Sequence, residues 1–319
     1  MKWENSNVFI TGADGFIGSW VAKGLVEKGA NVIVIRRDIK KDGGIRLQNL
    51  EDKVTLVEGD ICDYETIEKY LNEYSIDSCF HLAAQPIVGI ANKLPMSTFE
   101  TNIKGTWTLM EALRNMKTID RVVVASSDKA YGTHKELPYK EDQSLNGIYP
   151  YDASKACTDI LSRCYAVSFD LPVAVTRLAN VYGGADLHLD RIVPGTIISV
   201  MKGETPIIRS DGTPERDYMY AKDAASAYIT LAEAMPKFKG HGFNFGTETP
   251  ISVLTLIKKI IELCSKDIKP KILGEAKNEI DRQYLGSEKA KTELGWAPKY
   301  SLEEGLKETI EWYKNYLSK

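Results

Sequence analysis

A tyrosine and a lysine lie four positions apart near the middle of the chain, at Tyr151 and Lys155. On a helix, residues i and i+4 share a face, so the lysine ammonium can lie beside the tyrosine phenol. A phenol with its ordinary pKa of about 10 is a poor base at neutral pH, but nearby positive charge lowers that pKa. The pair therefore predicts proton transfer at a substrate hydroxyl. The spacing by itself also fits an exposed helix pair without chemistry.

A second polar group, Ser127-Asp128-Lys129, follows the apolar run Arg121–Ala125. In open parallel α/β sheets, ligands bind at the carboxyl ends of the strands. A hydroxyl at Ser127 could hydrogen-bond the same substrate oxygen that Tyr151 deprotonates. The alternative for this segment is a serine-rich turn with solvated charges.

A glycine-rich run of the form G-x-x-G-x-x-G follows the first apolar segment, Asn7–Thr11. Glycines at such a strand-to-helix turn let the backbone approach a pyrophosphate, and the helix N-terminus supplies N–H donors. This context predicts a site for NAD or NADP. The residues expected to contact the cofactor here are Gly12, Gly15, Phe16, Ile17 and Gly18.

The choice between the two cofactors depends on the end of the second apolar segment, which reads Arg36-Arg37-Asp38. Arginine there suits the 2′-phosphate of NADP, whereas Asp38 could bind the free ribose diol of NAD. The sequence leaves both open. Asp60 and Ile61, after the third segment, are expected at the adenine.

The elements that must position these residues alternate regularly in the first half of the chain. Continuous apolar runs with helical patterns between them predict a doubly wound parallel sheet of the Rossmann type, with helices on both faces. The expected strands are Asn7–Thr11, Asn31–Ile35, Lys53–Val57, Ser78–Leu82 and Arg121–Ala125, and expected helices include Phe16–Glu27, Tyr64–Glu73 and Met96–Met116.

After about residue 178 this alternation stops, and loops rich in Pro, Gly and charge separate shorter elements. We expect residues 1–178 to form the dinucleotide-binding domain and 179–319 to form mainly a smaller substrate-binding lobe, interleaved with the first. Amphipathic helices are predicted at Ser252–Cys264 and Leu302–Tyr316.

The composition excludes several classes of function. The 319 residues carry a formal net charge of -3, which gives no reason to expect nucleic acid or an anionic membrane as a partner. Five scattered cysteines and four histidines show no metal-ligand spacing, so no metal is expected. With no signal peptide and no membrane-spanning run in the sequence, we expect a cytoplasmic protein.

Taken together, five motifs resemble the extended short-chain dehydrogenase/reductase family of nucleotide-sugar epimerases and dehydratases. They are TGADGFIG, HLAAQP, SSDKAYG, YDASK and RLANVYGG, and the tail ELGWAPKYSLEEGL is also similar to this family. The resemblance implies that Ser127, Tyr151 and Lys155 form a hydroxyl–Tyr–Lys triad and that Ala83 contacts the cofactor. It also implies a nucleotide-diphosphate sugar as substrate and a tightly bound, recycled NAD or NADP.

Within this family the residues after the serine are informative. Asp128-Lys129 resembles CDP-glucose 4,6-dehydratases, as do Gln85-Pro86 and the segment Asp190–Pro194. The implied reaction oxidises C4 of the sugar, removes water across C5 and C6, and returns hydride to C6. Tyr151 would take the 4-hydroxyl proton, Lys129 the C5 proton, and Asp128 would protonate the departing 6-hydroxyl.

The substrate residues that the resemblance implies are polar or cationic, as a diphosphate requires; they are Gln85, Asn180, Arg191, Arg216 and Arg282. Some features differ from the CDP-glucose branch. Arg216-Asp-Tyr-Met-Tyr is similar to a form common among epimerases, and Arg36-Arg37 looks like NADP-using GDP-mannose dehydratases.

Two alternatives therefore stay beside the dehydratase, namely a 4-epimerase of the same family and a non-catalytic dinucleotide-binding sensor. The family resemblance also implies a homodimer that pairs helices Met96–Met116 and Tyr151–Ser168. Leu109, Leu113 and Leu161 on these helices fit either such an interface or the core of one subunit.

Overall fold

The centre of the computed structural model, which describes residues 3–275 and 280–318, is a seven-stranded sheet of order β11-β6-β5-β4-β1-β2-β3. All neighbouring strands in it run parallel. The doubly wound α/β fold predicted from the sequence is confirmed. The strands are β1 (Asn7–Thr11), β2 (Asn31–Arg36), β3 (Thr55–Glu58), β4 (Ser78–His81), β5 (Arg121–Ala125), β6 (Val173–Leu178) and β11 (Gly242–Phe245).

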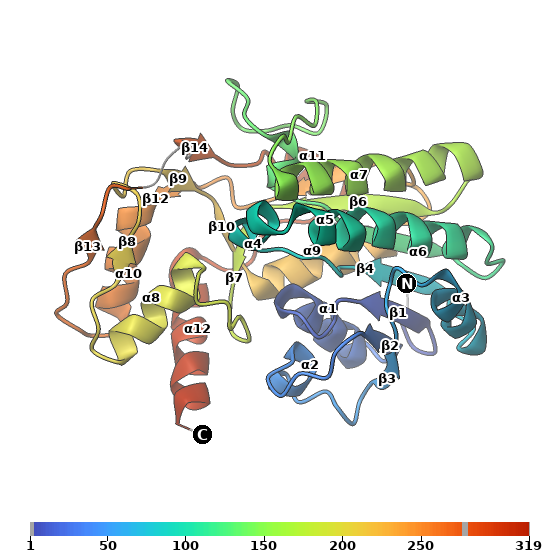
Figure 1. Cartoon of the computed structure of the whole chain (residues 1–319), viewed down its shortest axis with the longest axis horizontal. Coiled ribbons are helices and arrows are strands. Elements are labelled where there is room, and N and C mark those ends of the chain that lie inside the picture. Colours follow the sequence, from blue (N-terminus) through green and yellow to red (C-terminus); the bar gives the residue numbers. More distant parts are fainter. Residues whose placement is uncertain (1–2, 276–279, 319) are drawn as a thin grey trace.

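Helices cover both faces of this sheet (Figure 1). One face carries α1 (Phe16–Glu27) and α9 (Ala221–Glu233), which pack against each other. The other carries α3 (Tyr64–Glu73), α6 (Gly105–Arg114) and α7 (Pro150–Phe169). The strands read as unbroken apolar runs because both of their faces are buried.

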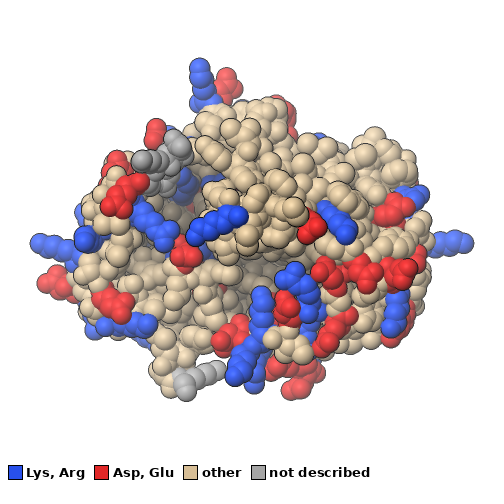
Figure 2. Space-filling view, in the orientation of Figure 1, with Lys and Arg blue, Asp and Glu red and all other residues tan. Residues whose placement is uncertain are grey.

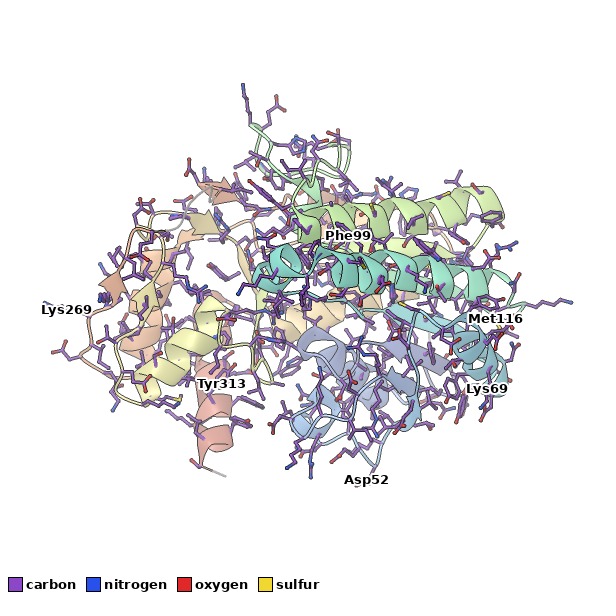
Figure 3. The ribbon with its side chains drawn as sticks, viewed as in Figure 1. Asp52, Lys69, Phe99, Met116, Lys269 and Tyr313 are labelled. Carbon is purple, nitrogen blue, oxygen red and sulfur yellow. The ribbon has the colours of Figure 1, made fainter. Side chains whose placement is uncertain are left out.

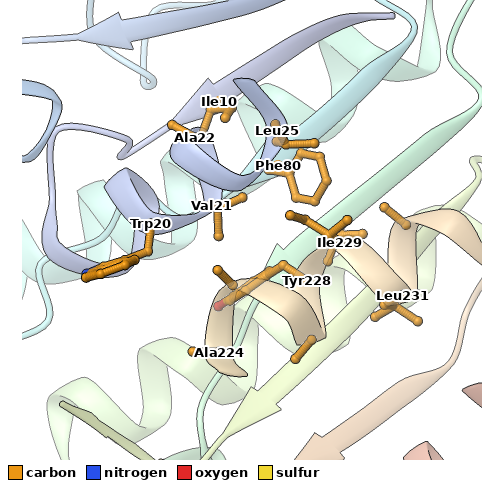
Figure 4. Close-up of a cluster of buried hydrophobic side chains, with 14 of the residues drawn as sticks. Ile10, Trp20, Val21, Ala22, Leu25, Phe80, Ala224, Tyr228, Ile229 and Leu231 are labelled. Atoms are coloured by element: carbon orange, nitrogen blue, oxygen red, sulfur yellow. The ribbon is translucent and has the colours of Figure 1, made fainter. Parts of the chain in front are cut away.

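The core between α1, α9 and the sheet is built from complementary apolar faces. Figure 4 shows Val21 and Leu25 of α1 turned toward Tyr228 and Ile229 of α9, with Phe80 of β4 beside them. All of these side chains are buried. This packing fixes the start of α1, and with it the glycine-rich turn, against the sheet.

One predicted helix differs in detail from the structure. The stretch expected as a single helix over Met96–Met116 consists of α5 (Pro95–Phe99), a π-helical turn η1 (Glu100–Lys104) and α6, which ends at Arg114. Thr106 and Thr158 both donate hydrogen bonds to the Asn102 carbonyl, at 2.6 and 2.8 Å. These side-chain bonds satisfy a carbonyl inside the wider turn, a pattern that spacing alone does not reveal.

The second lobe lies at the left in Figure 1 and is built from short strands and helices. Its helices include α8 (Ile192–Met201), α10 (Val253–Leu263) and α12 (Leu302–Leu317), and Ser252 and Ser301 cap the last two. The remaining described elements are α2 (Gly44–Leu47), α4 (Val88–Lys93), the 3-10 helix η2 (Asp128–Tyr131), β7 (Asn180–Tyr182), β8 (Ile207–Ile208), β9 (Glu215–Arg216), β10 (Tyr218–Tyr220), β12 (Ile251–Ser252), β13 (Lys271–Ile272), β14 (Arg282–Gln283) and α11 (Glu288–Leu294).

The chain crosses between the lobes more than once. After β7 and α8 in the small lobe, α9 and β11 return to the large sheet before α10 and α12 complete the small lobe. The domain boundary at residue 178 stays a prediction. It marks the point where the regular alternation of strands and helices stops, although later segments return to the large sheet.

Candidate active site

A cavity of about 1170 Å³ lies at the carboxyl ends of β1, β2, β4 and β5, between the sheet and the small lobe. Figure 2 shows a hollow on this side of the molecule with Lys and Arg side chains near its rim. Sites for one small ligand usually occupy roughly 300–1,000 Å³, so this cavity has room for a cofactor and a substrate together.

The glycine-rich turn lines one end of the cavity. Gly12 has a φ of +75°, and a Cβ there would lie 2.5 Å from the Ala83 backbone nitrogen. A Cβ at Gly18 would lie 2.2 Å from the Gly12 carbonyl oxygen. Only glycine fits at either position, and the N-terminus of α1 therefore faces the cavity as an anion site.

The end of β2 also lines the cavity with Arg36, Arg37 and Asp38. Arg36 Nε is buried and has no hydrogen-bond partner among the residues that the structure describes, an arrangement that a bound anion or ribose oxygen would complete. Arg37 Nε donates to Asp38 Oδ2 at 3.1 Å, and both side chains are exposed. The residues here fit a dinucleotide. All eleven predicted cofactor contacts outside the Tyr–Lys pair lie in the lining: Gly12, Gly15, Phe16, Ile17, Gly18, Arg36, Arg37, Asp38, Asp60, Ile61 and Ala83.

The predicted catalytic residues come from two neighbouring elements. Pro150 occupies the first turn of α7, where its missing N–H costs nothing, so Tyr151 and Lys155 fall in the first two turns. Ser127 precedes η2 and accepts a hydrogen bond from the Lys129 backbone nitrogen at 3.2 Å. α7 packs against η2, and all five predicted residues line the same cavity: Ser127, Asp128, Lys129, Tyr151 and Lys155.

The Tyr151 phenol is a weak acid in this structure. Burial raises its pKa to about 12, a hydrogen bond with Ser127 lowers it, and the charge of Asp128 raises it. Arg191 is the cation with the largest lowering effect on this pKa. Tyr151 therefore needs further positive charge or a reacting hydroxyl before it serves as a base at neutral pH.

Lys155 lies in the second turn of α7, and its side chain reaches the end of β5. Its Nζ donates to the Ala125 carbonyl oxygen at 2.7 Å, and burial lowers its pKa to about 8. The end of β5 therefore holds the Lys155 amine. The sequence argument that Lys155 acidifies Tyr151 directly stays a prediction for the liganded enzyme.

Asp128 and Lys129 form a small polar cluster beside Tyr151. The Ser127 hydroxyl donates to Asp128 Oδ1 at 3.0 Å, and Lys129 Nζ lies 3.9 Å from Asp128 Oδ2. Asp152, the residue after Tyr151, belongs to the same cluster. Burial raises the Asp152 pKa to about 6, Lys129 lowers it and Asp128 raises it. Three ionisable side chains thus share one charge environment.

Three of the predicted substrate residues line the cavity, although protein atoms already hold each of them. The Gln85 amide bonds within its own loop, to the Ile87 backbone and Thr98. Asn180 Nδ2 donates to the Asp217 carbonyl at 3.3 Å, and Arg191 Nη1 pairs with Asp186 at 2.9 Å.

The other two, Arg216 and Arg282, are not in the cavity lining. Arg282 Nε pairs with Glu215 at 2.7 Å, while Arg216 is buried and donates to the Glu215 carbonyl. Their role as phosphate ligands stays a prediction. Sequence reasoning passed over Arg209 and His188, which do line the cavity. For His188 the available signal was the charged loop 183–191 that contains it.

The described residues contain no cluster of His, Cys, Asp and Glu that could hold a metal ion. Of the helices that the structure describes, none is both long and apolar enough to cross a membrane.

Fold and site together define a nucleotide-sugar-modifying enzyme of the Rossmann type, and the chain belongs to the GDP-mannose 4,6 dehydratase family, whose model matches residues 9–309. The chain is 31% identical to CDP-glucose 4,6-dehydratase from Salmonella typhimurium, over 99% of this chain and 92% of that protein. It is 30% identical to human dTDP-D-glucose 4,6-dehydratase, over 96% of this chain and 89% of that protein.

Solved structures give the same answer for the fold. UDP-glucose 4-epimerase from Thermotoga maritima, with UDP-glucose, superposes with a TM-score of 0.91 at 33% identity, covering 98% of this chain and 99% of that one. dTDP-glucose 4,6-dehydratase from Bacillus anthracis, in complex with NAD, gives 0.86 at 27% identity, covering 97% of each chain. The resemblance stated from the motifs is confirmed.

Proposed function

We propose that this protein is a nucleotide-sugar 4,6-dehydratase that acts on a CDP-glucose-like substrate through a 4-keto intermediate. One observation carries the proposal: Asp128 and Lys129 lie in the cavity beside Ser127 and Tyr151, where a sugar carbinol would bind. A hydroxyl oxidation needs only the triad, whereas water loss needs the added acid and base.

The residues divide the proton transfers among themselves. Tyr151, hydrogen-bonded to Ser127, takes the proton of the sugar 4-hydroxyl. Lys129 as the neutral amine takes the C5 proton, which the 4-keto group has made acidic. Asp128 as the neutral acid gives its proton to the departing 6-hydroxyl, which leaves as water. When C6 is reduced, Lys129 returns a proton to C5, and the proton that Tyr151 took from the 4-hydroxyl balances the one that left with the water.

NAD or NADP fits the glycine-rich turn and the end of β2, and when bound it supplies the hydride acceptor and donor. Two dehydratases of similar structure, from Bacillus anthracis and Streptomyces venezuelae, were solved with NAD. The buried Nε of Arg36, which has no partner among the described residues, would also suit the 2′-phosphate of NADP. Tight binding of NADP is therefore the alternative to tight binding of NAD. Identification of the nucleotide released on denaturing the purified protein decides between them.

A 4-epimerase is the second candidate, favoured by the high similarity to the Thermotoga maritima epimerase. An epimerase returns hydride to C4 and has no use for an acid and a base beside C5 and C6. The Asp128–Lys129 pair therefore favours the dehydratase. The Tyr151–Lys155 pair and the large cavity that it lines argue against a non-catalytic sensor.

We further propose a homodimer formed by α5, α6 and α7. Leu109 and Leu113 are fully buried inside the subunit, so they belong to its core. Other apolar side chains on this layer are exposed instead, including Phe99 (labelled in Figure 3), Trp107, Ile160 and Val167. The five free cysteines fit the reducing cytoplasm, where we place the protein.

The experiment that tests the proposed function is incubation of the purified protein with CDP-, dTDP-, GDP- and UDP-glucose, followed by mass spectrometry of the products. We expect CDP-glucose to lose the mass of one water most rapidly. A product of unchanged mass from every substrate would contradict the dehydratase.

A further inference from the structure

Gln283, a residue of the small lobe, contacts the predicted acid–base pair directly. Its side chain is fully buried, and its Oε1 accepts a hydrogen bond from Lys129 Nζ. Its Nε2 donates to the Asp128 backbone carbonyl at 3.4 Å. Both ends of one carboxamide therefore hold the η2 segment that carries the pair.

The position of Gln283 is fixed from both sides. In β14 it pairs in parallel register with Arg216 of β9. Immediately after it, the Tyr284 carbonyl accepts from the Tyr139 backbone nitrogen at 3.0 Å, and Leu285 forms a bridge with Tyr139. These backbone contacts to β9 and Tyr139 hold the Gln283 backbone next to η2.

We propose that Gln283 is a positioning residue that aims the Lys129 amine for removal of the C5 proton and keeps that amine deprotonatable. The proposal rests on the proposed function, because it assigns Gln283 to the base of the dehydration step. Gln283 touches no reacting atom and acts through Lys129.

The chemistry of a carboxamide suits this task. A neutral amine has two hydrogens and one lone pair, and a hydrogen donated to Gln283 Oε1 restricts where the lone pair can point. A carboxylate at the same place would also orient the lysine, but it would stabilise the ammonium and raise its pKa. The neutral acceptor orients the base without that cost.

Two carboxylates already lie close to Lys129. Asp128 on η2 lies 3.9 Å away, and Asp152 on α7 interacts with it electrostatically. A third carboxylate at position 283 would therefore add to two that are present.

The test compares Gln283→Glu and Gln283→Leu with the wild-type enzyme, with Gln143→Glu as a matched control. The Gln143 side chain bonds to the backbone of its own loop, at Lys140 and Glu136, and does not line the cavity. Gln143→Glu therefore adds the same charge away from the cavity. Single-turnover kinetics separate C4 oxidation, seen as reduced nicotinamide, from water loss, measured by mass. Circular dichroism checks the fold of each variant.

For Gln283→Glu we expect the acidic limb of the water-loss rate to move up by about one pH unit, which is about tenfold slower at neutral pH. C4 oxidation and KM should stay near wild-type values. Gln283→Leu should slow water loss by about 10–100-fold at every pH, because the amine loses its orientation. Gln143→Glu should resemble the wild type.

A readout without turnover accompanies the kinetics. Titration of ¹³C-labelled lysine side chains by NMR, with the Lys129 signal assigned from Lys129→Arg, should show a higher Lys129 pKa in Gln283→Glu. An unchanged titration, or an unshifted pH limb with water loss intact, would overturn the role of Gln283 alone. Absence of water loss in the wild type would refute the proposed function itself, and the role of Gln283 with it.

Discussion

The Ser127 hydroxyl donates a hydrogen bond to Asp128 Oδ1 at 3.0 Å, although the same hydroxyl is also the hydrogen-bond partner of the Tyr151 phenol. A hydroxyl has one hydrogen to give. While Asp128 is ionised it competes for that hydrogen, and once Asp128 is protonated Ser127 can donate to the phenolate. The acid of the water-loss step and the base of the oxidation step are thereby coupled.

Replacing Asp128 by asparagine separates the two steps. We expect Asp128→Asn to retain C4 oxidation but to slow water loss by about 10²–10⁴-fold, because the general acid is gone. The charge of Asp128 raises the Tyr151 pKa. Removing that charge should therefore also move the acidic limb of the pH–rate profile for C4 oxidation to lower pH. Stopped-flow absorbance and product mass measure the two rates. Undiminished water loss would count against the assignment.

Replacing Ser127 by alanine should shift the same limb in the opposite direction. The hydrogen bond with Ser127 lowers the Tyr151 pKa, so Ser127→Ala raises that pKa further. Since the phenolate is the active base, the acidic limb of C4 oxidation should move to higher pH. The measurement is the pH dependence of single-turnover oxidation. A shift to lower pH would show that Ser127 does not stabilise the phenolate.

His81 should make folding stability depend on pH. It is buried between Thr11 and Thr106, with hydrogen bonds of 2.7 and 3.0 Å. Burial and Lys155 lower its pKa to about 3. The unfolded chain takes up a proton below its ordinary value of about 6.5, but the folded chain does not, so stability falls as pH drops from about 6.5 toward 3.

His81→Gln should remove up to about 1.4 kcal/mol per pH unit from the slope of unfolding free energy against pH in that window. Urea denaturation at several pH values measures the slope. Asp152, with its pKa raised to about 6, acts with the opposite sign and is common to both proteins, so the difference isolates His81. Identical slopes would contradict the buried neutral imidazole.

The exposed apolar layer on α6 and α7 should form the dimer interface. Trp107→Glu places a charge on it and should yield monomers, because an unpaired charge in an apolar interface is costly. Ile207→Glu is a matched control, since Ile207 is an exposed apolar residue of the small lobe. Size-exclusion chromatography with light scattering measures the mass. A monomeric wild type would refute the proposed dimer.

Residues whose roles depend on local spacing could be predicted from the sequence. The turn from Gly12 to Gly18 and the segments at Ser127 and Tyr151 are each fixed within one loop or helix, and the structure brings all of them to one cavity. The relatives and the family match confirm the predicted enzyme class.

Contacts between distant segments could not be read in this way. Gln283 reaches Lys129 across 154 residues, and nothing in the DRQYLG segment signals that pairing. The direction of the Lys155 side chain, toward the Ala125 carbonyl, depends on how α7 lies on β5. Leu109 and Leu113 show the same limit, because a helical pattern does not say which apolar face meets the subunit's own sheet.

The most direct test of the central claim is the proton NMR spectrum of the product formed from CDP-glucose in deuterated water. We expect a new C6 methyl signal, deuterium at C5 from exchange through the Lys129 base, and a 4-keto sugar. An intact C6 hydroxymethyl group with inverted C4 would contradict the claim and identify an epimerase.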